Sequence, residues 1–304
     1  MTEALLSLVA AELAFPGEPN PAMRAARCIA DDILAGHGEA VEAVIFYGSC
    51  RRSGDATGLL DLYVLTTSDR AFNGPGAAAF FNAALPPNVL HWRLDGPDGP
   101  LRAKVAVMTL HAFEGRMRPD ATDTTLWARF CQPATLVHAR DTEARRRVEA
   151  AVARAVEIAV TWALRLGAPT EPPAALWRHL FAKTYGAELR AERGNRPESI
   201  VATAPAWFDA ILPAALARLP ARPAADGGRA WARRWARRRA AGKALNVARL
   251  VKAAFTFNGG PDYLADKVAR HSGVAFELTP WQRRHPILAA PLLLWRLRRQ
   301  GAVR

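Results

Sequence analysis

The chain has 304 residues, half of them hydrophobic, which is enough for one large or two ordinary domains with a sizeable core. Its 41 lysines and arginines against 28 aspartates and glutamates give a net charge of +13, which fits a solvated basic face or an anionic partner. Three widely spaced cysteines match no disulfide or zinc pattern, and no apolar run approaches the roughly 20 residues that span a bilayer. These properties exclude a disulfide-stapled, zinc-finger or membrane-spanning protein.

The first part of the chain predicts a mixed sheet flanked by helices. Leu5, Val9 and Leu13 recur at helical spacing, and Asn20-Pro21 is typical of the start of a helix that reaches about Ala35. Strands are predicted over residues 42–47 and 59–66 and within LPPNVLHWRL and LRAKVAVMTL, with a polar loop after Gly48-Ser49 and a short helix near 77–84.

The second part of the chain predicts mostly helices. Asp141 is expected to cap a long helix that Gly167 ends, and a further helix follows two prolines at 172–173. Residues 205–228 are expected to form short helices and loops. The predicted fold class is therefore α/β (α+β), with a mixed sheet over residues 1–140 and a helical domain over residues 141–304.

The stretch between the first two strands predicts phosphate chemistry. Gly48 follows directly on a strand and lets the backbone approach a phosphate, while the Ser49 hydroxyl can donate to its oxygens. Arg51 and Arg52 come next, and Asp61 is the one metal-binding side chain on its strand face. The pattern is also compatible with an ordinary strand end and a hydrogen-bonded structural aspartate.

A further group is expected from a neighbouring strand. Lys104 stands in the otherwise apolar run LRAKVAVMTL, with Arg102 on the same face. Its ammonium group would supply fixed positive charge to phosphate oxygens, where many two-metal transferases place a third carboxylate. The alternative is a lysine at a strand edge or end that reaches solvent.

The order of these motifs resembles one known family. FYGSC, LLDLYVL, LPPNVLHW, LRAKVAVMTL and LWARFCQPATLV are similar to segments of the mitochondrial-type CDP-diacylglycerol synthases, the phosphatidate cytidylyltransferases of the translocator assembly and maintenance family. TYGAELR, at 184–190, resembles a later segment, so that the likeness covers about residues 40–195. The strand with a single aspartate is shared with the family, whereas Cys50 replaces a glycine and the loop before Asp61 is shorter.

The resemblance implies a nucleotidyltransferase domain that uses CTP and Mg²⁺. The phosphate of phosphatidic acid would attack the α-phosphorus of CTP, giving CDP-diacylglycerol and pyrophosphate. A phosphate monoester is already anionic at neutral pH and needs no strong general base, so a carboxylate-poor site is compatible with this reaction. The expected residues are Asp61 and Lys104 in catalysis, Gly48, Ser49, Arg51, Arg52, Tyr185 and Arg190 in nucleotide binding, and Asp61 and Glu188 in metal binding.

Basic segments in the second half predict contact with an anionic membrane surface. Arginines surround Trp231 and Trp235, and residues 280–304 again combine tryptophan, leucine and arginine. With no secretion signal at the start of the chain, we expect a cytoplasmic protein at the inner face of the cell membrane. The alternatives are a packed helix with a solvated arginine face and, less favoured because no RNA-binding module is seen, contact with nucleic acid.

Two other functions remain open at this point. One is a nucleotidyltransferase for a different acceptor, such as another lipid phosphate, a small molecule or tRNA. The other is a non-catalytic relative that binds anionic lipid. The lone Asp61 argues against hydroxyl acceptors, which need more help with deprotonation.

Overall fold

The computed structural model describes residues 2–186, 196–219, 228–256 and 279–284. In chain order its elements are α1 (Thr2–Leu13), α2 (Pro21–His37), η1 (Gly38–Ala40), β1 (Val41–Tyr47), α3 (Gly48–Ser53), β2 (Leu60–Thr66), α4 (Asp69–Asn73), α5 (Ala77–Ala84), β3 (Asn88–Gly96), β4 (Gly99–Thr109), α6 (Leu110–Arg116), α7 (Thr125–Phe130), β5 (Thr135–Ala139), α8 (Thr142–Arg165), α9 (Pro173–Tyr185), α10 (Arg196–Ala202), α11 (Pro205–Leu216), α12 (Gly228–Thr256) and α14 (Pro280–Arg284).

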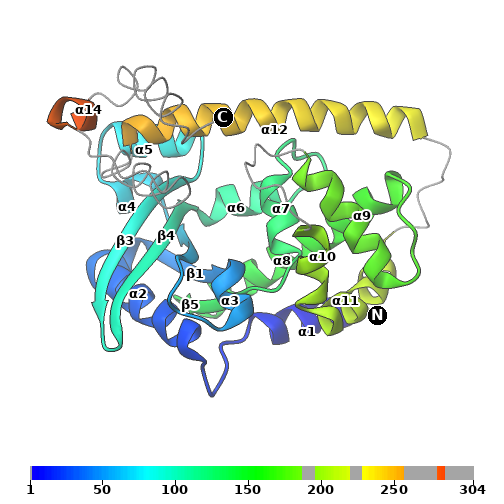
Figure 1. Cartoon of the computed structure of the whole chain (residues 1–304), viewed down its shortest axis with the longest axis horizontal. Coiled ribbons are helices and arrows are strands. Elements are labelled where there is room, and N and C mark those ends of the chain that lie inside the picture. The colour runs from blue at the N-terminus through cyan, green and yellow to red at the C-terminus, as the bar shows by residue number, and fades with distance from the viewer. Residues whose placement is uncertain (1, 187–195, 220–227, 257–278, 285–304) are drawn as a thin grey trace.

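Five strands form one mixed sheet in the order β3-β4-β2-β1-β5 (Figure 1). Strands β2 and β4 run parallel, and the other neighbouring pairs are antiparallel. The predicted fold class, a mixed sheet flanked by helices and followed by a helical part, is confirmed. The predicted caps are confirmed too, because the side chains of Asn20 and Asp141 accept hydrogen bonds from the first turns of α2 and α8.

Two elements next to β1 differ from the sequence prediction. The residues after β1, expected to form a loop, make the short helix α3, which Gly54 closes in a left-handed conformation by donating to the Cys50 carbonyl at 2.9 Å. Strand β5 adds a fifth strand next to β1, and it was not predicted because it comprises only five residues. The polar loop is thus shortened to the residues between Gly54 and Leu60.

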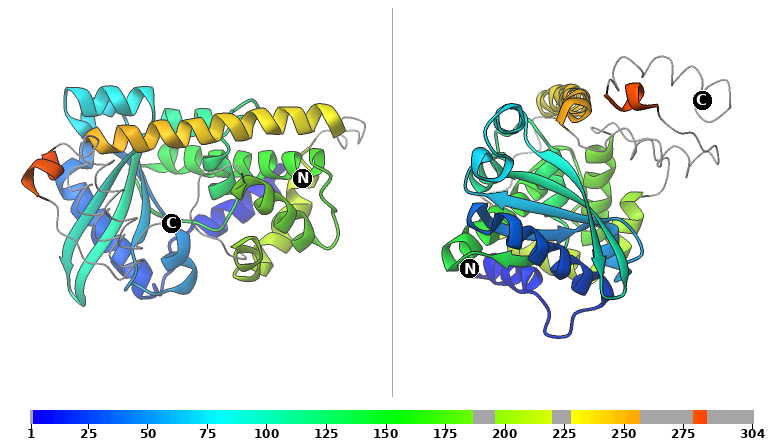
Figure 2. Two further views of the ribbon diagram at one scale, coloured as in Figure 1. Left: turned by 45° about the horizontal axis from the view of Figure 1, so that its top comes forward. Right: turned by 90° about the vertical axis from the view of Figure 1, so that its left-hand side faces the viewer.

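The two faces of the sheet are covered by different helices. Alternate strand residues such as Val44 and Phe46 point toward α2, which packs across one face (Figure 2). The intervening residues, such as Ala43 and Ile45, point the other way into a larger core built with α1 and α8. Each face therefore has its own buried cluster, and successive residues of a strand join the two clusters in turn.

The larger core includes residues from both ends of the described chain. Helix α1 packs against α8 and α11, so that Leu5 and Val9 are fully buried among side chains from the second half. The core on this face thus continues across residue 140. The division into domains 1–140 and 141–304 stays a prediction, and the packing joins the two parts closely.

Helix α12 runs along one side of the molecule, from the region of α9 to that of α5 and β3 (Figures 1 and 2). Near its beginning Trp235 is buried against Trp127 and Trp162. Near its end Lys252 donates to the carbonyl oxygens of Leu85 and Pro87. Among the described helices, none combines the length and the hydropathy needed to cross a bilayer.

Candidate functional site

One row of the sheet brings the predicted residues together. In the strand register, Asp61 on β2 is the direct neighbour of Tyr47 on β1 and of Lys104 on β4, and Lys104 is in turn opposite His91 on β3. Residues directly opposite each other in a sheet have Cβ atoms about 4.5–5.5 Å apart and point to the same face. Four side chains, one from each of four strands, therefore form a row that crosses the sheet, which we call the Asp61 row.

The Asp61 carboxylate lies directly against the backbone of Gly48. Gly48 has φ of 91°, a conformation that favours glycine, and a Cβ built on it would lie 2.5 Å from Asp61 Oδ2. Any side chain at position 48 would displace the carboxylate as well as strain the backbone. The sequence motif thus has a physical reason, because glycine is what lets the strand turn beside the acidic group.

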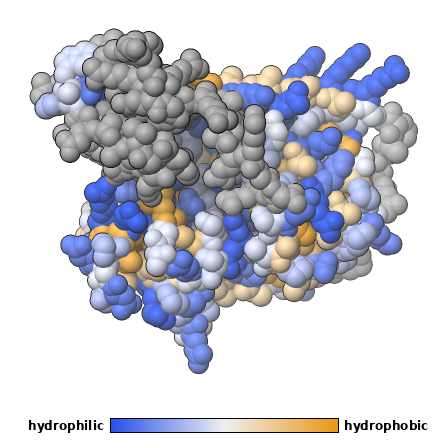
Figure 3. Space-filling model, in the orientation of Figure 1, coloured by the Kyte–Doolittle hydropathy of each residue, from blue (hydrophilic) through white to orange (hydrophobic). Residues whose placement is uncertain are grey.

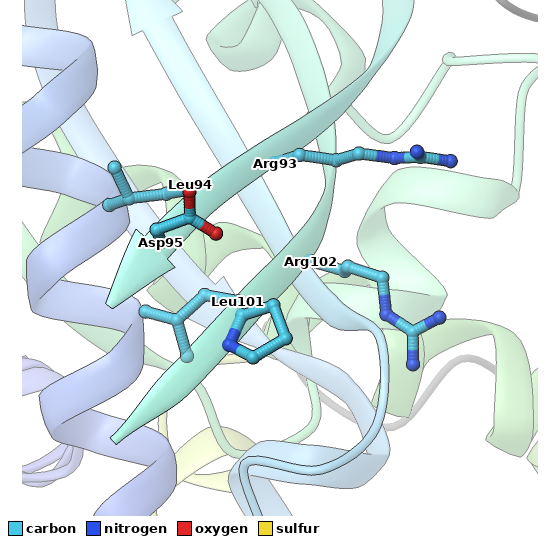
Figure 4. A pocket seen from close by; sticks show the side chains of 6 residues that line it. Arg93, Leu94, Asp95, Leu101 and Arg102 are labelled. Carbon is cyan, nitrogen blue, oxygen red and sulfur yellow. The ribbon is translucent and has the colours of Figure 1, made fainter. Parts of the chain in front are cut away.

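Basic side chains extend the Asp61 row toward the tip of the β3–β4 hairpin. Arg93 and Arg102 are opposite each other, two residues beyond His91 and Lys104 on their strands. They border a hollow of about 310 Å³ and point to the same side of the hairpin, whereas Leu94 lies on the side of α2 (Figure 4). Two like charges directly opposite one another are unfavourable by themselves. Asp95, which also borders the hollow, supplies one negative charge, and a bound anion would offset the remaining repulsion.

Arg129 and Tyr63 border the Asp61 row on the side away from the hairpin tip, next to Tyr47 of the row. Arg129, on α7, donates from Nη1 to the Tyr63 hydroxyl at 3.0 Å, and its guanidinium lies 5.3 Å from the centre of the Tyr47 ring. Tyr47, Tyr63 and Phe130 pack against one another, with ring centres between 5.2 and 5.7 Å apart. This aromatic cluster fixes Arg129 next to the strand end that carries Asp61.

Ser49, Arg51 and Arg52, the other residues predicted in the 48–52 motif, differ in their exposure and contacts. Ser49 is exposed and Arg52 is partly buried. Arg51 is held by the scaffold, because its guanidinium pairs with Glu12 on α1 and donates from Nε to Thr135 Oγ1 at 3.1 Å. A role for Arg51 in nucleotide binding stays a prediction, and the geometry gives it a role in fastening α1 to β5.

Cys50, the departure from the family motif, is accounted for by packing. Its side chain is buried in the core on the α2 face, its thiol donates to the Leu59 carbonyl at 3.4 Å, and a Cβ on Gly58 would lie 2.7 Å from its sulfur. Burial raises the pKa of the Cys50 thiol, with smaller contributions from the charges of Asp61 and Asp55. The thiol therefore fills space beneath the loop and stays protonated.

The described residues supply one carboxylate to the Asp61 row. Within the described ranges there is no group of three or more His, Cys, Asp or Glu residues placed to hold a metal ion. Mg²⁺ is often bound through only one or two carboxylates together with substrate phosphates, so the donor set fits a metal that enters with a nucleotide. Glu188 and Arg190, predicted as metal and nucleotide ligands, lie outside the described residues. Tyr185 ends α9 and packs against the larger core.

The structure adds His91, Arg93 and Arg129 to the set that the sequence predicted. A signal for the first two was present, since polar residues at 91, 93 and 95 alternate with apolar ones in NVLHWRLDG. No sequence period marks Arg129, which comes to the site through the packing of α7. Comparisons with protein-family models and with curated protein sequences each found no match to this chain.

Proposed function

We propose that the chain is an Mg²⁺-dependent nucleotidyltransferase whose acceptor is itself a phosphate. The observation that carries this proposal is the neighbourhood of Asp61, whose carboxylate lies against Gly48 and next to Lys104 in the strand register. A carboxylate beside fixed positive groups suits a metal-bound triphosphate, since the metal and the cations share the phosphate charge. When bound, the metal would polarise the phosphate that is attacked.

The chain's own residues have distinct parts in this proposal. Asp61 would hold the metal, and Lys104 with Arg102 and Arg93 would bind the phosphate oxygens along the sheet face. Arg129, fixed by Tyr63, would orient the nucleotide from the opposite side. Catalysis would then rest on positioning and charge neutralisation, with no group acting as a strong base.

The acceptor class rests on how readily the acceptor ionises. A hydroxyl acceptor needs a base to remove its proton, and the one carboxylate in the described part of the row would hold the metal, which leaves the His91 imidazole as the candidate base of the row. A phosphate monoester is already ionised at neutral pH. Together with the sequence resemblance, this favours phosphatidic acid as the acceptor, CTP as the donor and CDP-diacylglycerol as the product, formed at the inner face of the cell membrane.

The membrane contact in this proposal rests on exposed cations. Arg229, Arg233 and Arg239 on α12 are exposed, and hydrophilic side chains project along this helix at the top of the molecule (Figure 3). Basic residues near an anionic bilayer contribute roughly 1 kcal/mol each. Trp231 and Trp235, which the sequence suggested as anchors, pack toward α8 instead, whereas Trp281 on α14 is 53% exposed. The predicted tail beyond Arg284 lies outside the described residues.

The test is release of pyrophosphate from each of the four nucleoside triphosphates with Mg²⁺, in the presence and absence of phosphatidic acid vesicles. We expect turnover with CTP that requires the lipid. Asp61→Asn keeps the size of the side chain and its fit against Gly48 but removes the charge, so activity should fall by about 100-fold or more while the melting temperature holds.

Asp55→Asn is the matched control. Asp55 is an exposed carboxylate in the loop that leads into β2, and the Thr57 amide and hydroxyl already donate to it at 2.8 Å. Its loss should change turnover less than about twofold. Turnover without lipid would instead indicate another acceptor, and binding of vesicles without turnover of any nucleotide would indicate a non-catalytic lipid-binding protein.

A further inference from the structure

A second basic site lies between α12, α8 and the 119–122 segment, apart from the elements of the Asp61 row. It is a hollow of about 520 Å³. Its lining on the helices consists of two indole rings and four guanidinium groups, namely Trp162, Arg165, Trp231, Arg234, Arg237 and Arg238. Four cations around one concavity, with aromatic walls between them, form a strong local positive potential.

Three of the four arginines of this hollow are held in place by the tryptophans. Arg165 lies 3.9 Å and Arg234 lies 4.5 Å from the centre of the Trp231 ring, while Arg238 lies 4.4 Å from that of Trp162. Arg238 also donates to the carbonyl oxygens of Pro119 and Ala121, at 3.3 Å each. Stacked and hydrogen-bonded guanidinium groups have already lost much of their rotational freedom, so that a ligand would meet a preorganised set of donors.

Few negative charges balance these cations. None of Arg165, Arg234, Arg237 and Arg238 forms an ion pair with another described residue. The one acidic side chain in the lining, Asp120, is 77% exposed and faces Arg118 at 3.5 Å. Burial lowers the pKa of Arg165, and the charge of Arg234 adds to this effect. The cations thus repel one another, and the charge of Asp120 acts only in part against the lowering of the Arg238 pKa.

One residue of the lining also has an unsatisfied donor. The Nε of Arg165 is buried and has no hydrogen-bond partner in the described part of the structure, although nearly all buried donors in proteins have one. Thr122 contributes a further hydroxyl to the lining. The guanidinium forks of the lining arginines suit the oxygens of a phosphate group, which accepts several hydrogen bonds at once.

We propose that this hollow binds a phosphate monoester group, as a site separate from the Asp61 row. The guanidinium groups of Arg165, Arg234 and Arg237 would donate to the phosphate oxygens, and the indole rings would form the walls beside the rest of the ligand. The phosphate can belong to a soluble metabolite or to a lipid headgroup. The inference goes beyond the proposed transferase activity and does not depend on it.

Two double variants with the same change in charge test the site. Arg234→Gln with Arg237→Gln removes two lining cations, and Arg178→Gln with Lys183→Gln removes two exposed cations of α9, outside the lining. Binding of glycerol 3-phosphate is followed by calorimetry, and binding of phosphatidylcholine vesicles with and without phosphatidic acid by sedimentation. The full chain is used throughout, and a single-stranded oligonucleotide serves as a third probe.

We expect saturable binding. The lining variant should weaken it by about tenfold or more, because each charge-assisted contact is worth about a factor of ten. The control pair should change it less than about threefold. Glycerol 3-phosphate binding with this pattern identifies a free phosphate as sufficient, and binding only to phosphatidic acid vesicles identifies a lipid-borne phosphate. Equal losses in both pairs, no binding of either phosphate probe, or binding of the oligonucleotide alone would overturn the proposal. Asp61→Asn should leave this binding unchanged. A failure of the proposed phosphate site can therefore be distinguished from a failure of the proposed transferase activity.

Discussion

The two halves of α12 carry the same kind of charge and use it differently. Toward its end, Arg249 Nη2 lies 2.5 Å from the carboxylate of Asp123, and Lys252 Nζ reaches two backbone carbonyls. Toward its beginning, Arg234 and Arg237 border a hollow with aromatic walls and form no ion pair with another described residue. The first set holds the helix to the molecule, and the second set is left with unused binding capacity.

The comparison shows that the cations behind the net charge of +13 have different roles. Buried cations with a fixed counter-ion belong to the architecture, and their removal should appear in the stability. Cations that face one another across a hollow cost some stability and are compatible with a ligand. Changes in the two halves of α12 should therefore differ in size.

The largest effect is expected from Asp123→Asn. Asp123 is 4% exposed; burial alone would raise its pKa, yet Arg249 and the hydrogen bonds of Thr125 lower it overall. Its neutral replacement would leave Arg249 and Arg116 without their counter-ion, so the free energy of unfolding should fall by about 3 kcal/mol. Urea denaturation measures this loss. Asp120→Asn, an exposed carboxylate in the same segment, is the control and should change it by less than about 0.5 kcal/mol.

A smaller effect is expected in the pH dependence of stability. Burial, assisted by the charge of Arg249, lowers the pKa of Lys252 from 10.5 to about 8. Between those pH values the unfolded chain holds a proton that the folded chain has released, so the Lys252 contribution to stability rises with pH, by about 1–2 kcal/mol in total.

The measurement compares the unfolding free energy of the wild-type protein and of Lys252→Met from pH 7 to pH 11. Burial raises the pKa of the thiols of Cys50 and Cys131, which has the opposite sign, and both thiols are present in the two proteins. The difference between the two curves thus reports Lys252 alone. Parallel curves would contradict the expected shift.

The smallest effect is expected from Arg234→Gln. It removes a cation near Trp231 but also relieves repulsion of Arg165 and Arg238, whose pKa values are lowered by burial and, in addition, by Arg234. The two contributions offset each other, so the unfolding free energy should stay within about 0.5 kcal/mol. Thermal melting at low and high salt measures it, with Arg249→Gln as the counterpart that should lose about 2 kcal/mol. Equal losses in both variants would erase the distinction between the two halves.

Much of the fold could be predicted because its signals are local. Apolar runs marked four of the five strands, and Asn20 and Asp141 marked two helix starts. The short strand β5 and the helix α3 have too few residues to show a period, and they depend on pairing with β1 and on closure by Gly54. Local pattern could not reveal elements that only their neighbours stabilise.

The candidate site could be predicted in part for a similar reason. Gly48 and Asp61 were found from their strand context, but their contact depends on a backbone conformation that no spacing reveals. The pairing of Asp61 with Lys104 depends on the register of a parallel pair, which the long connection between β2 and β4 leaves undetermined in the sequence. The engagement of Arg51 by Glu12 joins residues that only the folded chain brings together.

The position of α1 has a consequence for how the protein is made. Residues 2–13 leave the ribosome well before α8 and α11, whose surfaces bury Leu5 and Val9. At roughly 5–20 residues per second, the apolar side of this helix waits for many seconds without its partners. During that time it is a target for chaperones or for association with other nascent chains. The larger core is therefore completed late in the synthesis of this protein.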